Sequence, residues 1–186
     1  MRLFVALDLP APVKHAMAPL ASGLGDVRWV PPEQQHLTLR FLGEIDERHL
    51  DEIAEALSLI PGAPFELRLK GIGHFPPRGP MKVLWVGVER HPELSQLKKR
   101  IDRVLRQTGL PPDERKFQPH VTIGRLKRPP SSDRLATWLM RHSLFASEPF
   151  PVSGFQLYSS HLRPDGAVHA IESSYELLPV HFDEVG

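Results

Sequence analysis

The chain has 186 residues, which suits one compact domain or two lobes that share a core. Its formal net charge is only +1, so an anionic ligand must be held by a local cluster of side chains and not by the field of the whole molecule. The absence of cysteine excludes disulfides, thiolate metal sites and cysteine nucleophiles. Because this composition fits a reducing cytosol and no apolar run approaches the roughly 20 residues that span a bilayer, we expect a cytoplasmic protein.

The first part of the chain predicts two strands and two helices. Residues 2–8 alternate and are rich in branched and aromatic side chains, so we interpret them as a core strand and not as a signal peptide. Residues 12–24 place apolar side chains on one helical face, and Pro19 within this pattern predicts a kink or an early end. A second strand follows at 36–42, and Asp46 then predicts the N-cap of the second helix.

The remainder of the chain predicts more strands than helices. Strands are expected at 65–75, 82–89, 118–127, 150–160 and 168–178. One helix is expected at 92–108, and Ser131 or Ser132 caps another. Several of these strands are joined by short turns and there is no steady βαβ rhythm, which indicates an α+β fold with mostly antiparallel pairing. No low-complexity linker interrupts the chain, so we expect residues 1–186 to form a single domain with two lobes.

One short pattern occurs twice, about half a chain length apart. The first copy is His36-Leu37-Thr38-Leu39-Arg40-Phe41-Leu42, and the second is His120-Val121-Thr122-Ile123-Gly124-Arg125-Leu126. Each copy reads His-x-Thr-aliphatic, ends in leucine and is followed by a predicted capped helix. The duplication indicates two related lobes that face each other across a pseudo-twofold axis.

Strand geometry brings the polar residues of each copy together. Side chains at i and i+2 share a face, so His36 points with Thr38, and His120 points with Thr122. Two imidazoles supply an acid and a base near neutral pH, and two hydroxyls supply donors for phosphate oxygens. A lone His-x-Thr is more often a half-buried structural histidine, but two matched copies favour acid–base catalysis of in-line displacement at phosphorus.

At these residues the sequence resembles the two-histidine phosphoesterase superfamily, and within it the RNA 2′,3′-cyclic phosphodiesterases once called 2′-5′ RNA ligases. The resemblance extends through nearly the whole chain. It rests on the two motifs, the second extended to 117–125, and on the segments 2–7, 28–31, 71–73, 75–76, 83–88, 160–162 and 166–167. One departure is His169, which stands where relatives often carry a tyrosine.

The resemblance implies a bilobal fold whose two mostly antiparallel sheets line a central cleft, with helices on the outside. It implies hydrolysis of RNA 2′,3′-cyclic phosphate ends to 2′-phosphomonoesters without a metal or another cofactor, and 2′-5′ RNA ligation as the reverse reaction. Carried over to this chain, His36 is the proton donor, His120 is the proton acceptor, and Thr38 and Thr122 hold the phosphate. The expected partner is RNA, with tRNA fragments among the candidates. The protein is expected to be a monomer with no membrane partner.

Strand parity predicts the facing of three further residues. Arg40 shares the parity of His36 and is predicted to face the phosphate or the RNA backbone. Arg125 has odd parity to His120, so it must turn inward at the strand end to bind substrate; the family pattern favours this over a solvated arginine. Phe41 has the parity of the apolar side, which predicts that it lies in the core.

Three other functions stay open. The chain could be a cyclic phosphodiesterase for small nucleotides, or a non-catalytic RNA-binding relative, although two complete motifs argue against the latter. A metallohydrolase would need histidine ligands, for which His74, His161 and His169 are candidates without a tight spacing motif. Resistance of the activity to a chelator would distinguish the metal-free mechanism.

Overall fold

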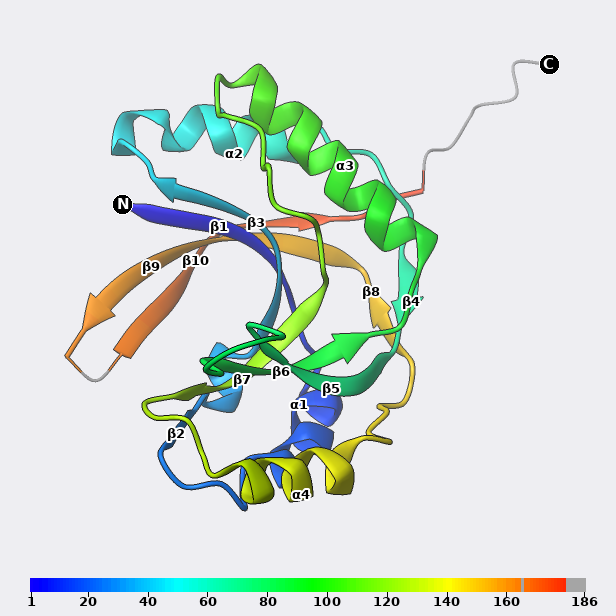
Figure 1. Ribbon diagram of the computed structural model, residues 1–186. Helices are drawn as coiled ribbons and strands as arrows, with labels where there is room; N and C mark the ends of the chain where they lie inside the picture. Colours follow the sequence, from blue (N-terminus) through cyan, green and yellow to red (C-terminus); the bar gives the residue numbers. More distant parts are fainter. Residues whose placement is uncertain (165, 180–186) are drawn as a thin grey trace.

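The computed structural model describes residues 1–164 and 166–179, which form an α+β fold with two antiparallel halves (Figure 1). The strands are β1 (Arg2–Asp8), β2 (Val27–Trp29), β3 (His36–Glu44), β4 (Phe65–Leu67), β5 (Leu69–Phe75), β6 (Val83–Val88), β7 (His120–Leu126), β8 (Phe150–Val152), β9 (Gly154–Arg163) and β10 (Gly166–Glu176). The α-helices are α1 (Ala11–Met17), α2 (Leu50–Ser58), α3 (Pro92–Gln107) and α4 (Ser132–His142). The predicted fold class is therefore confirmed.

The main sheet consists of two halves that meet at the repeated motifs. The first half has the order β10-β9-β1-β3, and the second has the order β7-β6-β5 with β2 also beside β7. Among the described residues, β3 and β7 pair through Leu37 and Val121, the second residue of each motif. The two copies thus run antiparallel past each other at the centre of the molecule, as a pseudo-twofold relation requires.

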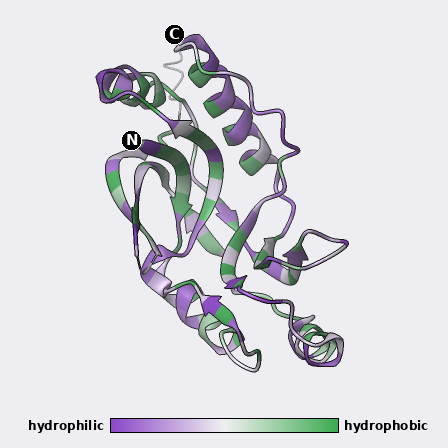
Figure 2. Cartoon of the chain, turned by 60° about the vertical axis from the view of Figure 1, so that its left-hand side comes forward, coloured by the Kyte–Doolittle hydropathy of each residue, from purple (hydrophilic) through white to green (hydrophobic). Residues whose placement is uncertain are grey.

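Helices cover the outer faces of both halves (Figure 1). Helices α2 and α3 contact each other, α3 contacts β3, and α4 contacts β5. Each helix carries both hydrophilic and hydrophobic residues, as an element with one face on the core must (Figure 2). One apolar cluster fills the space beneath them, with Leu37, Leu39, Val121 and Ile123 of the two motifs among its buried members.

Local signals set several element ends as expected. Helix α1 stops at Met17 and continues only as a 3₁₀ turn through Pro19, because proline cannot extend the helix. Asp46 caps the next helical segment, with its side chain accepting a hydrogen bond from the backbone N–H of Arg48. No helix in the described part of the chain is long and apolar enough to cross a membrane.

Both motif strands contain a β-bulge at the fourth residue. In β3, Thr38 pairs with Ala6 and Arg40 pairs with Val5, so Leu39 has no partner in β1. In β7 the same irregularity falls on Ile123, because the next two pairs join Thr122 to Trp85 and Gly124 to Leu84. An extra residue reverses the facing of the residues that follow it, up to the next irregularity, which in β3 falls at Leu42. Simple alternation from the histidine therefore fails beyond the fourth position in both strands.

Candidate active site

Both motif histidines are held by the same local hydrogen bond. Nδ1 of His36 lies 2.7 Å from the carbonyl oxygen of Gln34, and Nδ1 of His120 lies 2.7 Å from that of Gln118. A carbonyl only accepts, so Nδ1 carries the proton in each ring and Nε2 is left for other chemistry. Both carbonyls belong to a glutamine two residues before the histidine, which extends the sequence repeat to Gln-x-His-x-Thr.

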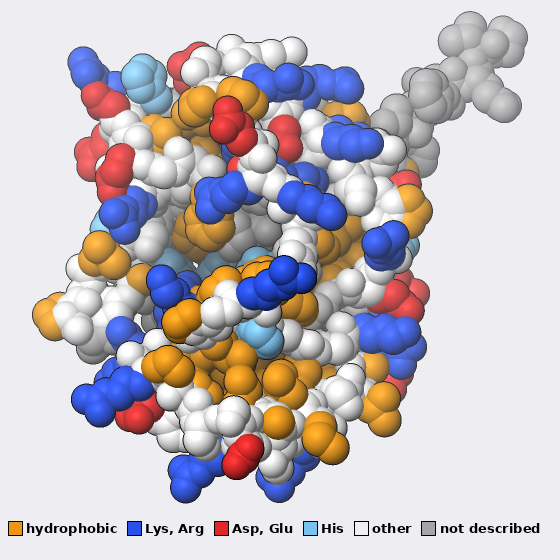
Figure 3. Space-filling model, viewed as in Figure 1, with side chains coloured by type: hydrophobic (Ala, Val, Ile, Leu, Met, Phe, Trp, Pro, Cys, Tyr) orange, Lys and Arg blue, Asp and Glu red, His pale blue; other side chains and the backbone are white. Residues whose placement is uncertain are grey.

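The four motif side chains open onto one cleft of about 580 Å³. His36 and Thr38 line it from β3, and His120 and Thr122 line it from β7. Histidine side chains are visible near the middle of the face drawn in Figure 3, with Lys and Arg side chains around them. The structure therefore brings together the two halves of the predicted site.

The cleft concentrates positive charge in a nearly neutral chain. Among the described residues, its charged lining consists of three arginines, Arg2, Arg28 and Arg125, and includes no carboxylate. Arg28 pairs with Arg125 in adjacent strands, although like charges side by side repel each other. This arrangement is suited to an anionic ligand, which would offset the repulsion.

His36 lies in an aromatic environment on the first half of the sheet. Its ring stacks on Phe4 at a centroid distance of 4.8 Å and lies 5.9 Å from Tyr158. His169 meets it edge-on at 5.2 Å. Burial lowers the pKa of His36 to about 4; the Gln34 carbonyl opposes this shift, and His169 adds to it. The ring is therefore neutral at pH 7 in the free protein.

His120 has a comparable apolar surround on the second half. Phe75 lies edge-on at 5.0 Å, and Trp85 lies 6.2 Å away. Burial lowers the pKa of His120, the Gln118 carbonyl opposes the shift, and the charge of Arg125 lowers the pKa further. Each half of the molecule thus presents one imidazole with a fixed tautomer against an aromatic wall.

The bulges decide which arginine reaches the cleft. Arg125 follows the bulge at Ile123, so its side chain turns to the face of His120 and lines the cleft as predicted. Phe41 occupies the equivalent position in β3. Contrary to the prediction that it lies in the core, it is 52% exposed and lines the cleft, because the bulge at Leu39 reverses its facing.

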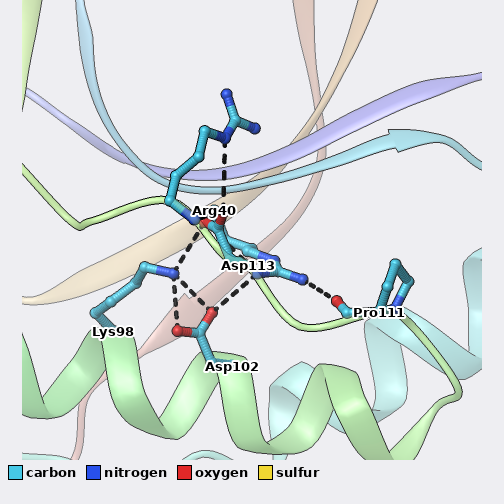
Figure 4. Close-up of polar contacts among 6 residues, drawn as sticks. Arg40, Lys98, Asp102, Pro111 and Asp113 are labelled. Carbon is cyan, nitrogen blue, oxygen red and sulfur yellow. Dashed lines mark hydrogen bonds and ion pairs between the residues drawn. The ribbon is translucent and has the colours of Figure 1, made fainter.

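The prediction that Arg40 faces the substrate is wrong. Arg40 is 4% exposed and points to the helical side of the sheet, where it pairs with Asp102 at 3.6 Å and Asp113 at 3.5 Å (Figure 4). It also donates a hydrogen bond to the carbonyl of Pro111. The same bulge causes this change, because it moves Arg40 to the face of the buried leucines.

Several cleft residues were not assigned to the site from the sequence. Arg2 and Phe4 line it from β1, where their i and i+2 spacing gave a signal that they share one face. His169 lines it from β10, far from either motif in sequence. His74, His161 and His169 do not form a metal-ligand group, since no set of three or more His, Asp or Glu side chains in the described residues is placed to hold an ion.

The fold and the paired motifs define the class of protein: an α+β phosphoesterase with two His-x-Thr strands facing one cleft. The family model of the 2′-5′ RNA ligase superfamily matches residues 10–164. The chain belongs to this superfamily, as its sequence predicted.

Individual relatives agree with the family match. The chain is 35% identical over 172 residues to an RNA 2′,3′-cyclic phosphodiesterase of Archaeoglobus fulgidus, covering 91% of this chain and 96% of that protein. It is 36% identical to one of Thermotoga maritima, covering 92% of each. A crystal structure of the Thermus thermophilus protein TT0787 superposes with a TM-score of 0.80 at 29% identity, covering 97% of this chain and all of that one. Escherichia coli LigT complexed with 3′-AMP gives a TM-score of 0.72 at 26% identity, covering 95% and 97%.

Proposed function

We propose that this protein is an RNA 2′,3′-cyclic phosphodiesterase that hydrolyses the cyclic end to a 2′-phosphomonoester. One observation carries the proposal: two imidazoles of the same tautomer open onto a single cleft that has arginines but no carboxylate among its described lining. The names of the relatives support the substrate class, since those of Archaeoglobus fulgidus and Thermotoga maritima are RNA 2′,3′-cyclic phosphodiesterases.

The proposed reaction divides the proton transfers between the two halves of the molecule. Nε2 of His120 accepts a proton from water as the water oxygen bonds to phosphorus. The bond from phosphorus to the 3′ oxygen breaks, and His36 donates a proton to that oxygen. Water is consumed, the 2′ ester bond stays intact, and a 3′ hydroxyl is released. The same steps with a 5′ hydroxyl in place of water as the nucleophile would join RNA ends through a 2′-5′ linkage, again with release of the 3′ hydroxyl.

In this scheme, three side chains stabilise the negative charge on the non-bridging oxygens of the five-coordinate phosphorus in the transition state. The hydroxyls of Thr38 and Thr122 donate to the non-bridging oxygens, and Arg125 offsets their negative charge. A bound anion also favours the imidazolium form, so substrate binding raises the pKa of His36 from the low value it has in the free protein. Substrate binding thereby favours the protonated form of His36, which can then donate its proton to the departing 3′ oxygen.

The biological setting that we propose is the cytoplasm, with the protein acting as a monomer on RNA fragments, such as those of tRNA. The cysteine-free sequence suits a reducing compartment.

Acid and base are both side chains, so hydrolysis should continue in EDTA. Loss of turnover in EDTA that a specific divalent ion restores would contradict the metal-free mechanism.

The decisive experiment incubates the protein with a short RNA that ends in a 2′,3′-cyclic phosphate and maps the hydroxyl that keeps the phosphate. His36→Ala and His120→Ala should each slow hydrolysis on the order of 10²–10⁴-fold, the usual range for a general acid or base. His49→Ala is the matched control, since His49 is exposed and lies outside the cleft lining. Full activity of either motif variant, or a 3′-phosphate product, would refute the proposal.

The two histidine roles can be separated by the leaving group. A substrate whose 3′ leaving group is already very acidic needs no general acid, so His36→Ala should be largely rescued. His120→Ala should stay slow, because water still has to be activated. Rescue of His120→Ala alone would reverse the assigned roles.

A further inference from the structure

His169 is a third imidazole in the cleft and lies outside both motifs. On β10 it pairs with Ser160 of β9, which pairs in turn with Arg2 of β1. These residues form a row across three strands, and all of them line the cleft. The ring of His169 lies 5.2 Å from that of His36, centroid to centroid, at an angle of 87°. His169 therefore stands beside the proposed acid on the same wall of the cleft.

The ring nitrogens of His169 differ from those of the motif histidines. Its Nδ1 is buried and has no hydrogen-bond partner among the described residues, whereas Nδ1 of His36 and of His120 each bond to a carbonyl. Nε2 is not among the buried unpaired atoms, and the side chain lines the cleft. Since no described residue fixes the tautomer, either nitrogen can carry the proton, and Nε2 is accessible to a ligand.

The unpaired charge that faces His169 most directly is positive. Arg125 faces it from β7, and His36 adjoins it from β3. Arg2 lies in its row on β1, but its charge is paired with Glu44 of β3 at 2.7 Å. On β9, Tyr158 stays uncharged because burial raises its pKa to about 12. Burial lowers the pKa of His169, and the charge of Arg125 lowers it further. The ring is therefore neutral at pH 7 until an anion enters and reverses the balance.

We propose that His169 is a further substrate-contacting residue that binds the ligand's phosphate through its accessible ring nitrogen and takes up a proton as the ligand binds. This inference rests on the proposed function, because it places a phosphate between the two motifs. A phosphomonoester loses its second proton near pH 6, so the product carries more negative charge than the cyclic diester. The contact to His169 is thus strongest with the product, and it retains the product most tightly in mildly acidic solution.

Calorimetric titration of the full chain with adenosine 2′-monophosphate tests the inference without turnover. The titration is run at pH 6 and pH 8, each in two buffers of different ionisation enthalpy, which counts the protons taken up. His169→Phe keeps an aromatic ring beside His36 but removes both nitrogens, and His169→Gln keeps a donor that cannot be charged. His161→Gln is the matched control, since His161 lies on the adjacent strand outside the cleft lining.

At pH 6, His169→Phe should bind the nucleotide about 10- to 100-fold more weakly than the wild type, the range for one charge-assisted hydrogen bond. Both His169 variants should take up fewer protons, and the affinity difference should shrink at pH 8, where the ring stays neutral. In the wild-type protein, the imidazole NMR signals of His169, assigned through the proximity of its ring to that of Phe4, should titrate at higher pH when the nucleotide is bound.

Unchanged affinity and proton uptake in His169→Phe would overturn the inference. So would an NMR titration in which the pKa of His169 is the same with and without the nucleotide. The NMR measurement uses the wild-type chain, so it decides the matter even if a variant folds poorly. Failure of the proposed function would give a different result. The wild-type protein would then bind adenosine 2′-monophosphate but would not hydrolyse RNA that ends in a cyclic phosphate.

Discussion

At the scale of single residues, the site depends on how each imidazole is oriented and how far it is desolvated. The backbone carbonyls of Gln34 and Gln118 fix the tautomers of His36 and His120, so each ring keeps Nε2 for proton transfer. Aromatic neighbours lower both pKa values in the free protein. Catalysis therefore requires the ligand's negative charge to favour the imidazolium of one ring.

The pH dependence of kcat/KM should reflect these lowered pKa values. The active free enzyme has neutral His120 and protonated His36, so activity rises as His120 loses its proton and falls as His36 loses its own. The pKa of His36 is about 4 and that of His120 lies below 6.5, so the maximum should fall on the acid side of pH 6.5. The optimum of kcat should lie higher, because the bound anion raises both values. Rates measured from pH 4 to 8 with a cyclic nucleotide check this, and a kcat/KM maximum above pH 7.5 would contradict it.

The motif threonines should matter less than the histidines. Thr38→Ala and Thr122→Ala each remove one donor to the phosphate, which should slow hydrolysis by about 10- to 1000-fold, by analogy with oxyanion-hole donors. Thr137→Ala on α4 is the control, because its hydroxyl bonds to the Asp133 carbonyl outside the cleft. Wild-type rates in both motif variants would show that the threonines are structural.

At the scale of elements, the bulge in β3 places residues of one strand on opposite faces of the sheet, where they have different roles. His36 and Thr38 precede it and line the cleft, whereas Arg40 joins a buried charge cluster between β3, α3 and the segment after α3 (Figure 4). Lys98 completes this cluster, with Nζ at 2.7 Å from Asp102 and 3.3 Å from Asp113. Arg115, which is mostly exposed, also lies 3.6 Å from Asp113, so three cations surround the two carboxylates. The cluster ties the segment that leads to His120 to the strand that carries His36.

Breaking this cluster should destabilise the fold more than it affects catalysis. Arg40→Met removes the buried guanidinium that contacts both Asp102 and Asp113 and leaves only Lys98 and the exposed Arg115 beside them, which should cost about 3 kcal/mol of unfolding free energy. Arg48→Met removes the exposed partner of Asp46 and should leave the urea midpoint unchanged. KM should stay near the wild-type value in both variants. If Arg40→Met left the urea midpoint unchanged but raised KM, Arg40 would contact the substrate and would not serve mainly to stabilise the fold.

At the scale of the whole molecule, the two halves meet along the cleft and share its charge. Arg28 belongs to β2 of the second half, yet its guanidinium lies so close to Gly166 of β10 that a Cβ on this glycine would collide with Nη2. The arginines of the cleft lining therefore come from both halves, although the formal net charge of the chain is only +1. Attraction for RNA should accordingly be local and screened by salt.

RNA binding should show a shallow salt dependence. Arg2 of the cleft lining is already paired with Glu44, so two phosphate contacts to single-stranded RNA, from Arg28 and Arg125, give a slope of about −1.4 for log K against log salt concentration. Arg125→Gln should reduce the slope by about 0.7. Binding of a non-cleavable RNA between about 50 and 300 mM salt measures both values, and a slope near zero would exclude arginine–phosphate contacts.

Short-range patterns in the sequence determined the α+β class, the element ends near Pro19 and Asp46, and the duplicated motif with its four polar side chains. These features depend on residues a few positions apart, whose periodicity and capping chemistry can be read directly. The family resemblance depended on the same local motifs, and the family match confirmed it.

Tertiary structure decided which side chains share the cleft beyond those motifs. Pairing with β1 created the bulge at Leu39, which buried Arg40 and exposed Phe41; alternation within β3 alone gives no sign of an extra residue. The strand order β10-β9-β1-β3 brought His169 beside His36, although they are far apart along the chain. Neither outcome is encoded in a local pattern, because each depends on the register between strands and on which strands become neighbours.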